Sequence, residues 1–144
     1  MIYVSSEFWN KFFNRFLIAF TFWEALGIPL RILFFAKLYE DTSFKSYFLT
    51  VGEIYWPFPF LVDLIQVFFI GLVSVFTRRE PSGGIASGIF FGIFFSLGAY
   101  FSTSLLLMTF TTIPRFPLLM TAIVLSIQTI IATSIFFIES TDSE

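Results

Sequence analysis

The chain has 144 residues, of which 57% are hydrophobic, 12% are charged and 24 are phenylalanine, and its formal net charge is −2. Soluble domains carry about 25% charged residues, and a soluble core of this size cannot cover so many apolar rings, so the composition predicts a membrane protein. The eight Lys and Arg residues are spread along the chain, which argues against a basic surface for nucleic acid.

The chain also contains no histidine and no cysteine. It therefore lacks the usual ligands of haem, iron–sulfur clusters and zinc, and it can form neither a disulfide nor a Ser–His–Asp or Cys–His catalytic group. No GxxxxGK[S/T] or GxGxxG sequence for phosphate binding occurs. We expect no enzymatic activity, no catalytic residue, no metal site and no cofactor.

The first predicted element, residues 1–15, is a short amphipathic helix lying in the membrane interface. One helical face is aromatic and the other is polar, which is the pattern of interfacial helices. The aromatic face carries Phe8, Trp9, Phe12 and Phe13, with Phe16 beyond, and the polar face carries Asn10, Lys11, Asn14 and Arg15. A cleaved secretory signal is not expected, because the following apolar run is too long and no small-residue cleavage site follows it.

Four apolar stretches follow, and each reaches the roughly 20 residues needed to cross a bilayer. They cover about residues 16–39, 57–76, 85–110 and 117–138. Because the connections are short, neighbouring spans should run antiparallel. The predicted fold is all-α: a polytopic domain over residues 16–138, built as an antiparallel bundle of four transmembrane helices, followed by an acidic tail over residues 139–144.

The basic residues near the span ends favour one orientation of this bundle. One side carries Lys11, Arg15, Arg78 and Arg79, and the other carries Lys37, Lys45 and Arg115. The side richer in Lys and Arg is expected to be cytoplasmic, which places both termini in the cytoplasm. We expect a multi-pass protein of a prokaryotic plasma membrane rather than an organelle membrane.

Three charged residues lie inside the first two spans, away from the span ends: Glu24, Arg31 and Asp63. If these spans form a hairpin, Arg31 and Asp63 lie at a similar depth, so we predict an ion pair between them. Asp63 pairing with another subunit and Arg31 reaching a lipid headgroup are the alternatives. Glu24 lies roughly 10 Å deeper along the helix than Arg31. We expect Glu24 to be neutral and hydrogen-bonded near Gln128 and Tyr100, or alternatively to act in proton coupling or substrate binding.

Small residues form a stripe along the third span, and a polar row follows the fourth. Stripes of small residues let helix backbones approach closely in lipid, and hydroxyl or amide groups bond across helices, so both features predict helix packing. A ligand-lining glycine face and a polar pore lining are the alternatives. The stripe is Gly84, Gly88, Gly92 and Ser96, and the row is Ala122, Ser126, Gln128, Thr129 and Thr133.

The segment WEALG, residues 23–27, resembles small multidrug transporters, which are four-span proteins with one membrane-embedded glutamate in the first helix. This resemblance implies a transport role for Glu24. It covers about five residues. The chain departs from the family pattern in its greater length, in the additional charges Arg31 and Asp63, and in having no tryptophan in its third span.

These features predict an accessory, non-catalytic integral membrane subunit of a larger complex, such as a respiratory or other energy-transducing one, with other membrane subunits and lipids as partners. The alternative is a small proton-coupled transporter or channel that uses Glu24 and works as a homo-oligomer. A third hypothesis, a lipid-binding protein, depends on the amphipathic N-terminal segment.

Overall fold

The computed structural model describes residues 6–40, 47, 55, 57–77 and 84–138. These residues form helices, with no strand among them. Four stretches are long and apolar enough to cross a membrane: Glu7–Phe34, Pro57–Thr77, Gly84–Phe110 and Arg115–Phe137. The predicted fold class is confirmed, and the length and composition of these helices are those of a multi-pass membrane protein.

The helices follow one another along the chain with the third span divided into three parts. Their bounds are α1 (Ser6–Glu40), α2 (Pro57–Thr77), α3 (Gly84–Ser96), the π-helical segment η3 (Leu97–Phe101), α4 (Ser102–Phe110) and α5 (Arg115–Phe137). Apart from α1, the span ends lie within two residues of those expected from the sequence. The acidic tail, residues 139–144, lies outside the described residues, as do Lys45, Arg78 and Arg79.

Helix α1 differs from the prediction because residues 6–15 do not form a separate interfacial helix. They are the first turns of one 35-residue helix that also continues through Pro29. Such a helix is about 50 Å long, so it tilts or extends beyond a hydrocarbon core of about 30 Å. Phe12 and Phe16 of the expected interfacial face are buried in contact with Phe68, whereas Trp9 and Phe13 are exposed. Two of the five aromatic side chains on this face are thus packed inside the bundle.

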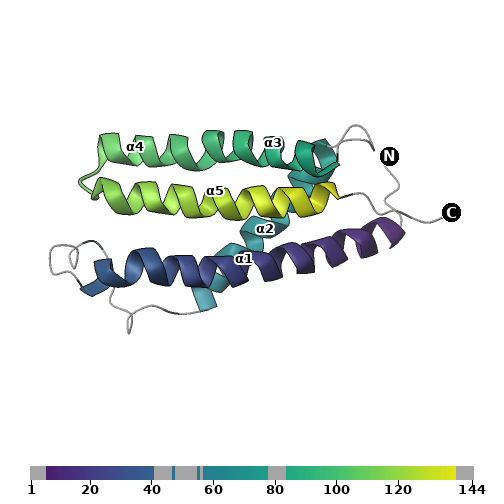
Figure 1. Ribbon diagram of the computed structural model, residues 1–144, viewed down its shortest axis with the longest axis horizontal. Helices are drawn as coiled ribbons and strands as arrows, with labels where there is room; N and C mark the ends of the chain where they lie inside the picture. The colour runs from purple at the N-terminus through teal and green to yellow at the C-terminus, as the bar shows by residue number, and fades with distance from the viewer. Residues whose placement is uncertain (1–5, 41–46, 48–54, 56, 78–83, 139–144) are drawn as a thin grey trace.

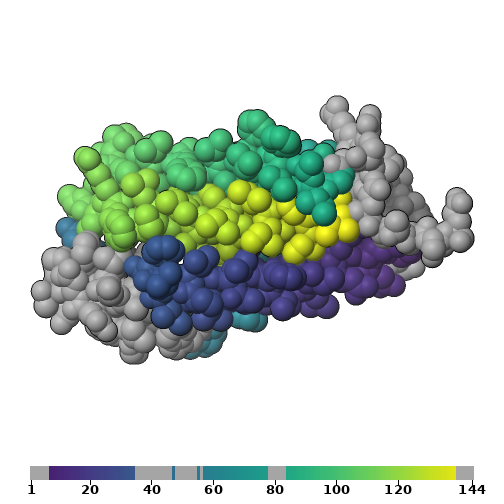
Figure 2. Space-filling view, viewed as in Figure 1, coloured from purple at the N-terminus to yellow at the C-terminus, as the bar shows by residue number. Residues whose placement is uncertain are grey.

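Helix α5 is the centre of the bundle, and it contacts α1, α2 and the third span. In Figure 1, α5 lies between α1 and the α3–α4 span, and α2 crosses behind them. Figure 2 shows the same order as three adjacent bands on one face of the molecule. Each span runs opposite to the one before it, so α1 begins and α5 ends at the same end of the bundle (Figure 1).

The hydrophobic core lies where α1, α2 and α5 meet. Its aromatic centre is Phe12, whose ring is 5.6 Å from Phe68 of α2 and 5.7 Å from Phe136 of α5, measured between ring centroids. Gly71 of α2 leaves room for Phe136, because a Cβ at position 71 would overlap the ring. The buried core residues are Phe12, Phe16, Ala19, Trp23, Val67, Ile70, Ala132 and Phe136.

The π-helical segment η3 keeps one face of the third span against α5. Residues that contact or face α5 recur every four positions: Gly88, Gly92, Ser96, Tyr100 and Ser104. In an α-helix with 3.6 residues per turn, this spacing would rotate the contact face by about 160° between positions 88 and 104. One extra residue in a π turn removes about 100° of that rotation. The sequence does not predict η3, because residues 84–110 have the pattern of one continuous apolar helix.

Candidate functional site

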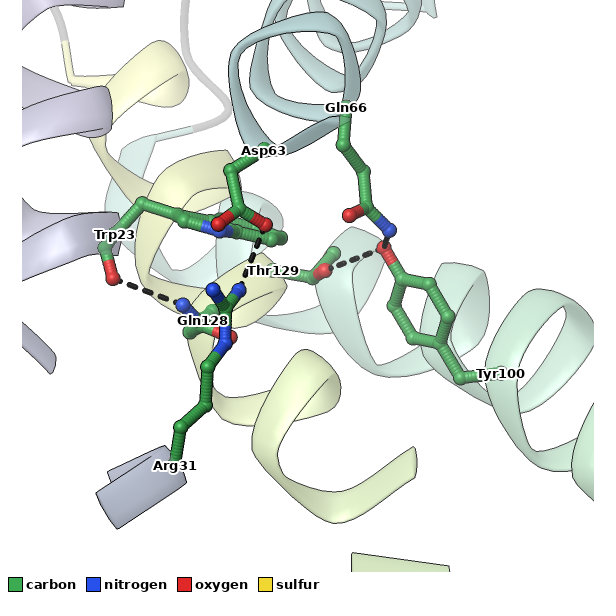
Figure 3. A network of polar contacts seen from close by, with 7 residues as sticks. All are labelled: Trp23, Arg31, Asp63, Gln66, Tyr100, Gln128 and Thr129. Atoms are coloured by element: carbon green, nitrogen blue, oxygen red, sulfur yellow. Dashed lines mark hydrogen bonds and ion pairs between the residues drawn. The ribbon is translucent and has the colours of Figure 1, made fainter. Parts of the chain in front are cut away.

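The charges of the first two spans meet inside the bundle. Arg31 Nη2 donates a hydrogen bond to Asp63 Oδ1 over 2.7 Å (Figure 3), so the predicted ion pair is present. The Asp63 side chain is 4% exposed and the Arg31 side chain 35% exposed. The pair joins α1 to α2 and places the carboxylate in the interior, with the arginine stem at its edge.

Glu24 lies closer to this pair than its position in the sequence suggests. Glu24 shares one face of α1 with Gly27 and Arg31, three and seven residues further along the helix, and one of its carboxyl oxygens is buried. The long Arg31 side chain points back toward the N-terminus of α1, so its guanidinium lies nearer to Glu24 than the position of Arg31 along the helix indicates. The Arg31 guanidinium carbon lies 3.9 Å from the place that a Cβ on Gly27 would occupy, one turn before Arg31. Glu24, Arg31 and Asp63 therefore form one cluster.

Gln128 of α5 borders the same cluster. Its Nε2 donates to the backbone oxygen of Trp23 over 2.8 Å and thereby ties α5 to α1. Gly27 makes this approach possible, since a Cβ at position 27 would overlap Gln128 Nε2. We predicted Gln128 near Glu24. In the structure Gln128 bonds to the backbone of Trp23, the residue before Glu24, and not to the Glu24 side chain.

Several polar atoms of this cluster are buried without a hydrogen-bond partner among the described residues. They are Trp23 Nε1, Glu24 Oε1, Asp63 Oδ2 and Gln128 Oε1. A buried polar atom without a partner is costly in an apolar interior. Two carboxyls beside one guanidinium would also leave one excess negative charge if both were ionised. This cluster, which we call the carboxyl cluster (Trp23, Glu24, Arg31, Asp63 and Gln128), is the best candidate for a functional site.

A second polar network connects three helices beside the carboxyl cluster. Tyr100 Oη accepts hydrogen bonds from Gln66 Nε2 and Thr129 Oγ1, each over 3.0 Å (Figure 3). The network thus joins α2, η3 and α5. Among the described residues, Tyr100 makes its side-chain hydrogen bonds with Gln66 and Thr129 and none with Glu24. The part played by Gln66 was not predicted. A glutamine in an otherwise apolar span was the signal available for it.

The glycine stripe of the third span packs against α5 of the same chain. A Cβ on Gly88 would lie 2.7 Å from Ser134 Cα, and one on Gly92 would lie 2.7 Å from Ile130 Cα. Ser96 is buried and donates to Gly92 O within its own helix. Gly84 is an exception, because a Cβ there would meet no atom within 4 Å. Its φ of +52° indicates instead a left-handed conformation at the start of α3.

The polar row of α5 is buried, and its members serve different contacts. Thr133 Oγ1 donates to Gly88 O over 2.8 Å across the helix interface. Thr129 and Gln128 make the contacts with Tyr100 and Trp23 given above, whereas Ser126 donates to Ala122 O in its own helix. Both the stripe and the row thus contribute to helix packing. A surface depression on the outer side of α1, lined by Leu17, Ile18, Thr21 and Phe22, includes none of these residues.

A basic side chain ties the two chain-terminal spans together near their common end. Arg15 Nη1 of α1 donates to Phe136 O over 3.2 Å. Carbonyl groups in the last turn of a helix lack intrahelical donors, and a cation there also interacts favourably with the helix dipole. Among the described residues, no three His, Cys, Asp or Glu side chains come together as a metal site would require.

No protein-family model, curated protein or solved structure matches this chain. The class of protein is therefore the one that the fold itself defines: a four-span α-helical membrane protein with a carboxyl cluster between α1, α2 and α5.

Proposed function

We propose that the chain is an accessory, non-catalytic integral membrane subunit of a larger membrane complex, such as an energy-transducing one. The observation that carries this proposal is the use of the polar side chains. Those of the second, third and fourth spans tie helices together through Gln66, Tyr100, Thr129 and Thr133. Arg31 and Gln128 connect α1 to its neighbours. Such polar contacts stabilise the assembly of helices without performing chemistry.

The outer surface supports the same proposal. Large apolar side chains cover it, and Phe94 and Phe110 of the third span are 71% and 78% exposed. Apolar surface of this kind is suited to lipid acyl chains and to the apolar helices of other membrane subunits. The proposed partners are therefore other integral membrane subunits and lipids.

Our proposal also includes a location in a prokaryotic plasma membrane, with both termini in the cytoplasm. The start of α1 and the end of α5 share one end of the bundle (Figure 1). Lys11 and Arg15 belong to that end, and the excess of basic residues on one side favours a cytoplasmic position for it. Labelling of single cysteines introduced at Thr112 and Asn14 from either side of the membrane would test this orientation.

Purification of the chain from its native membrane in a mild detergent tests the accessory role. We expect other integral membrane proteins to co-purify in fixed stoichiometry, and we expect their assembled amount to fall when the chain is depleted. Quantitative mass spectrometry measures both. Recovery of the chain alone, or as a homo-oligomer, would contradict the proposal.

A second candidate function, a small proton-coupled transporter or channel acting as a homo-oligomer, is favoured by one observation. Glu24 lies on the same face of α1 as Arg31, the ion-pair partner of Asp63, and both carboxyls have a buried oxygen without a partner among the described residues. Intramembrane carboxyls in such positions often carry protons or substrates. The discriminating measurement is proton flux into liposomes that contain the purified chain. Flux that is abolished by Glu24→Gln would favour the transporter.

The structure lends little support to the third hypothesis, a lipid-binding function. That hypothesis depends on a free amphipathic segment at the N-terminus. Phe12 and Phe16 instead face the core with Phe68 and Phe136, so much of the segment's apolar face is used within the chain.

A further inference from the structure

The hydrogen bonding of Asp63 leaves one of its two oxygens for another donor. Arg31 occupies Oδ1, whereas Oδ2 is buried and has no partner among the described residues. Glu24 Oε1 is in the same condition, and Glu24 lies one turn before Gly27, beside which the Arg31 guanidinium lies. Ionised carboxylates only accept hydrogen bonds, so two of them cannot satisfy one another. A single proton between them would satisfy both oxygens.

We propose that this pair is a proton-binding site in which protonated Glu24 donates a hydrogen bond to Asp63 Oδ2, while Arg31 keeps Asp63 ionised. The proton makes the three side chains electrically neutral together, which suits a cluster inside the membrane. It also adds a second bond between α1 and α2, on the carboxylate that already accepts from Arg31. A hydrogen bond between a carboxylic acid and a carboxylate is charge-assisted and therefore strong.

The surrounding groups favour a proton over a metal cation. The Arg31 guanidinium lies 2.7 Å from Asp63 and would repel a second cation at the same carboxylate. Helix α5 contributes the neutral groups Gln128 and Thr129, and η3 contributes the Tyr100 hydroxyl, which is bonded to Gln66 and Thr129. Trp23 adds one neutral N–H donor. Among the described residues packed here, Arg31 is thus the one cation.

Infrared spectroscopy of the purified, lipid-reconstituted chain tests the site directly, because a protonated carboxyl has its own C=O stretching band. We expect this band in the wild type at neutral pH, with a shift in D₂O, and we expect it to be absent in Glu24→Gln. The matched control is Glu7→Gln, at an exposed glutamate that pairs with Lys11, and it should retain the band. No band in the wild type, or a band that survives in Glu24→Gln, would overturn the proposal.

Isotope labelling keeps the test decisive even if a variant fails to fold. In wild-type protein, ¹³C-labelled glutamate should move the band, whereas ¹³C-labelled aspartate should leave it in place. The opposite result would assign the proton to Asp63 and contradict the proposal. A band that is lost on adding Na⁺ at constant pH would show a metal cation displacing the proton, which also contradicts it.

Stability measurements separate the two carboxyls further. Gln has the size of protonated Glu and can donate a hydrogen bond to Asp63, so Glu24→Gln should unfold at nearly the wild-type temperature. Asp63→Asn removes the charge that Arg31 needs, and it should unfold at a clearly lower temperature. Equal losses in both variants would contradict the assigned roles. None of these results depends on co-purifying subunits, so the proton site and the accessory function can fail separately.

Discussion

The Asp63 side chain is buried and accepts a hydrogen bond from Arg31, so its negative charge relies on a guanidinium from another helix. Replacing Arg31 by Ala leaves that charge without its cation, and we expect a loss of about 3 kcal/mol, at the lower end for buried pairs because Arg31 is partly exposed. The double variant Arg31→Ala with Asp63→Asn should lose less than Arg31→Ala alone. Unfolding of the variants in a fixed detergent measures these differences. Strictly additive losses would show that the two side chains do not interact.

Removing the Tyr100 hydroxyl, a single atom, tests the second polar network. Tyr100→Phe deprives Gln66 and Thr129 of their common acceptor. Polar contacts between membrane helices contribute about 0.6 kcal/mol on average, so we expect a loss of about 1 kcal/mol. Tyr55 is 67% exposed, and Tyr55→Phe is the matched control with no expected loss. The midpoint of thermal unfolding in detergent compares the two variants, and equal midpoints would contradict the role given to the network.

Helix packing of the third span depends on the absence of a side chain at Gly88. Gly88→Ala would place Cβ 2.7 Å from the backbone of Ser134, so α3 and α5 would have to move apart. We expect a loss of about 1–3 kcal/mol, which is typical of overpacking, and Gly88→Leu should also reduce expression and assembly. At Gly98 a Cβ would meet no atom within 4 Å, so Gly98→Ala is the control and should unfold like the wild type. Equal stability of Gly88→Ala and Gly98→Ala would disprove the tight packing.

The elements differ in how well the sequence predicts them. Hydropathy alone locates the four spans, because lipid requires about 20 apolar residues in each. The pairing of Arg31 with Asp63 follows from depth along a hairpin of two helices. The position of the Arg31 guanidinium beside Gly27 and near Glu24 does not, because it depends on where the long Arg31 side chain points. The hydrogen bond between Gln66 and Tyr100 depends on how α2 and the π-helical segment η3 are rotated toward each other. No local sequence pattern predicts that rotation.

We propose that the polar groups inside the molecule hold the helices together and do not catalyse a reaction or transport protons. Replacing Glu24 by Gln tests this proposal most directly, because Gln preserves the size and polarity of the side chain but has no proton to exchange. Variants at Glu24 and Gly88 therefore separate function from packing. Both can be introduced into the native host and compared in the same membranes.

The measurement is the activity of the parent complex divided by its assembled amount, determined in native membranes for wild type, Glu24→Gln and Gly88→Leu. We predict near-normal assembly and activity for Glu24→Gln. For Gly88→Leu we predict less assembled complex, with unchanged activity per assembled complex. A selective loss of proton-linked activity in Glu24→Gln, with assembly intact, would contradict the accessory role and favour the proton-coupled transporter.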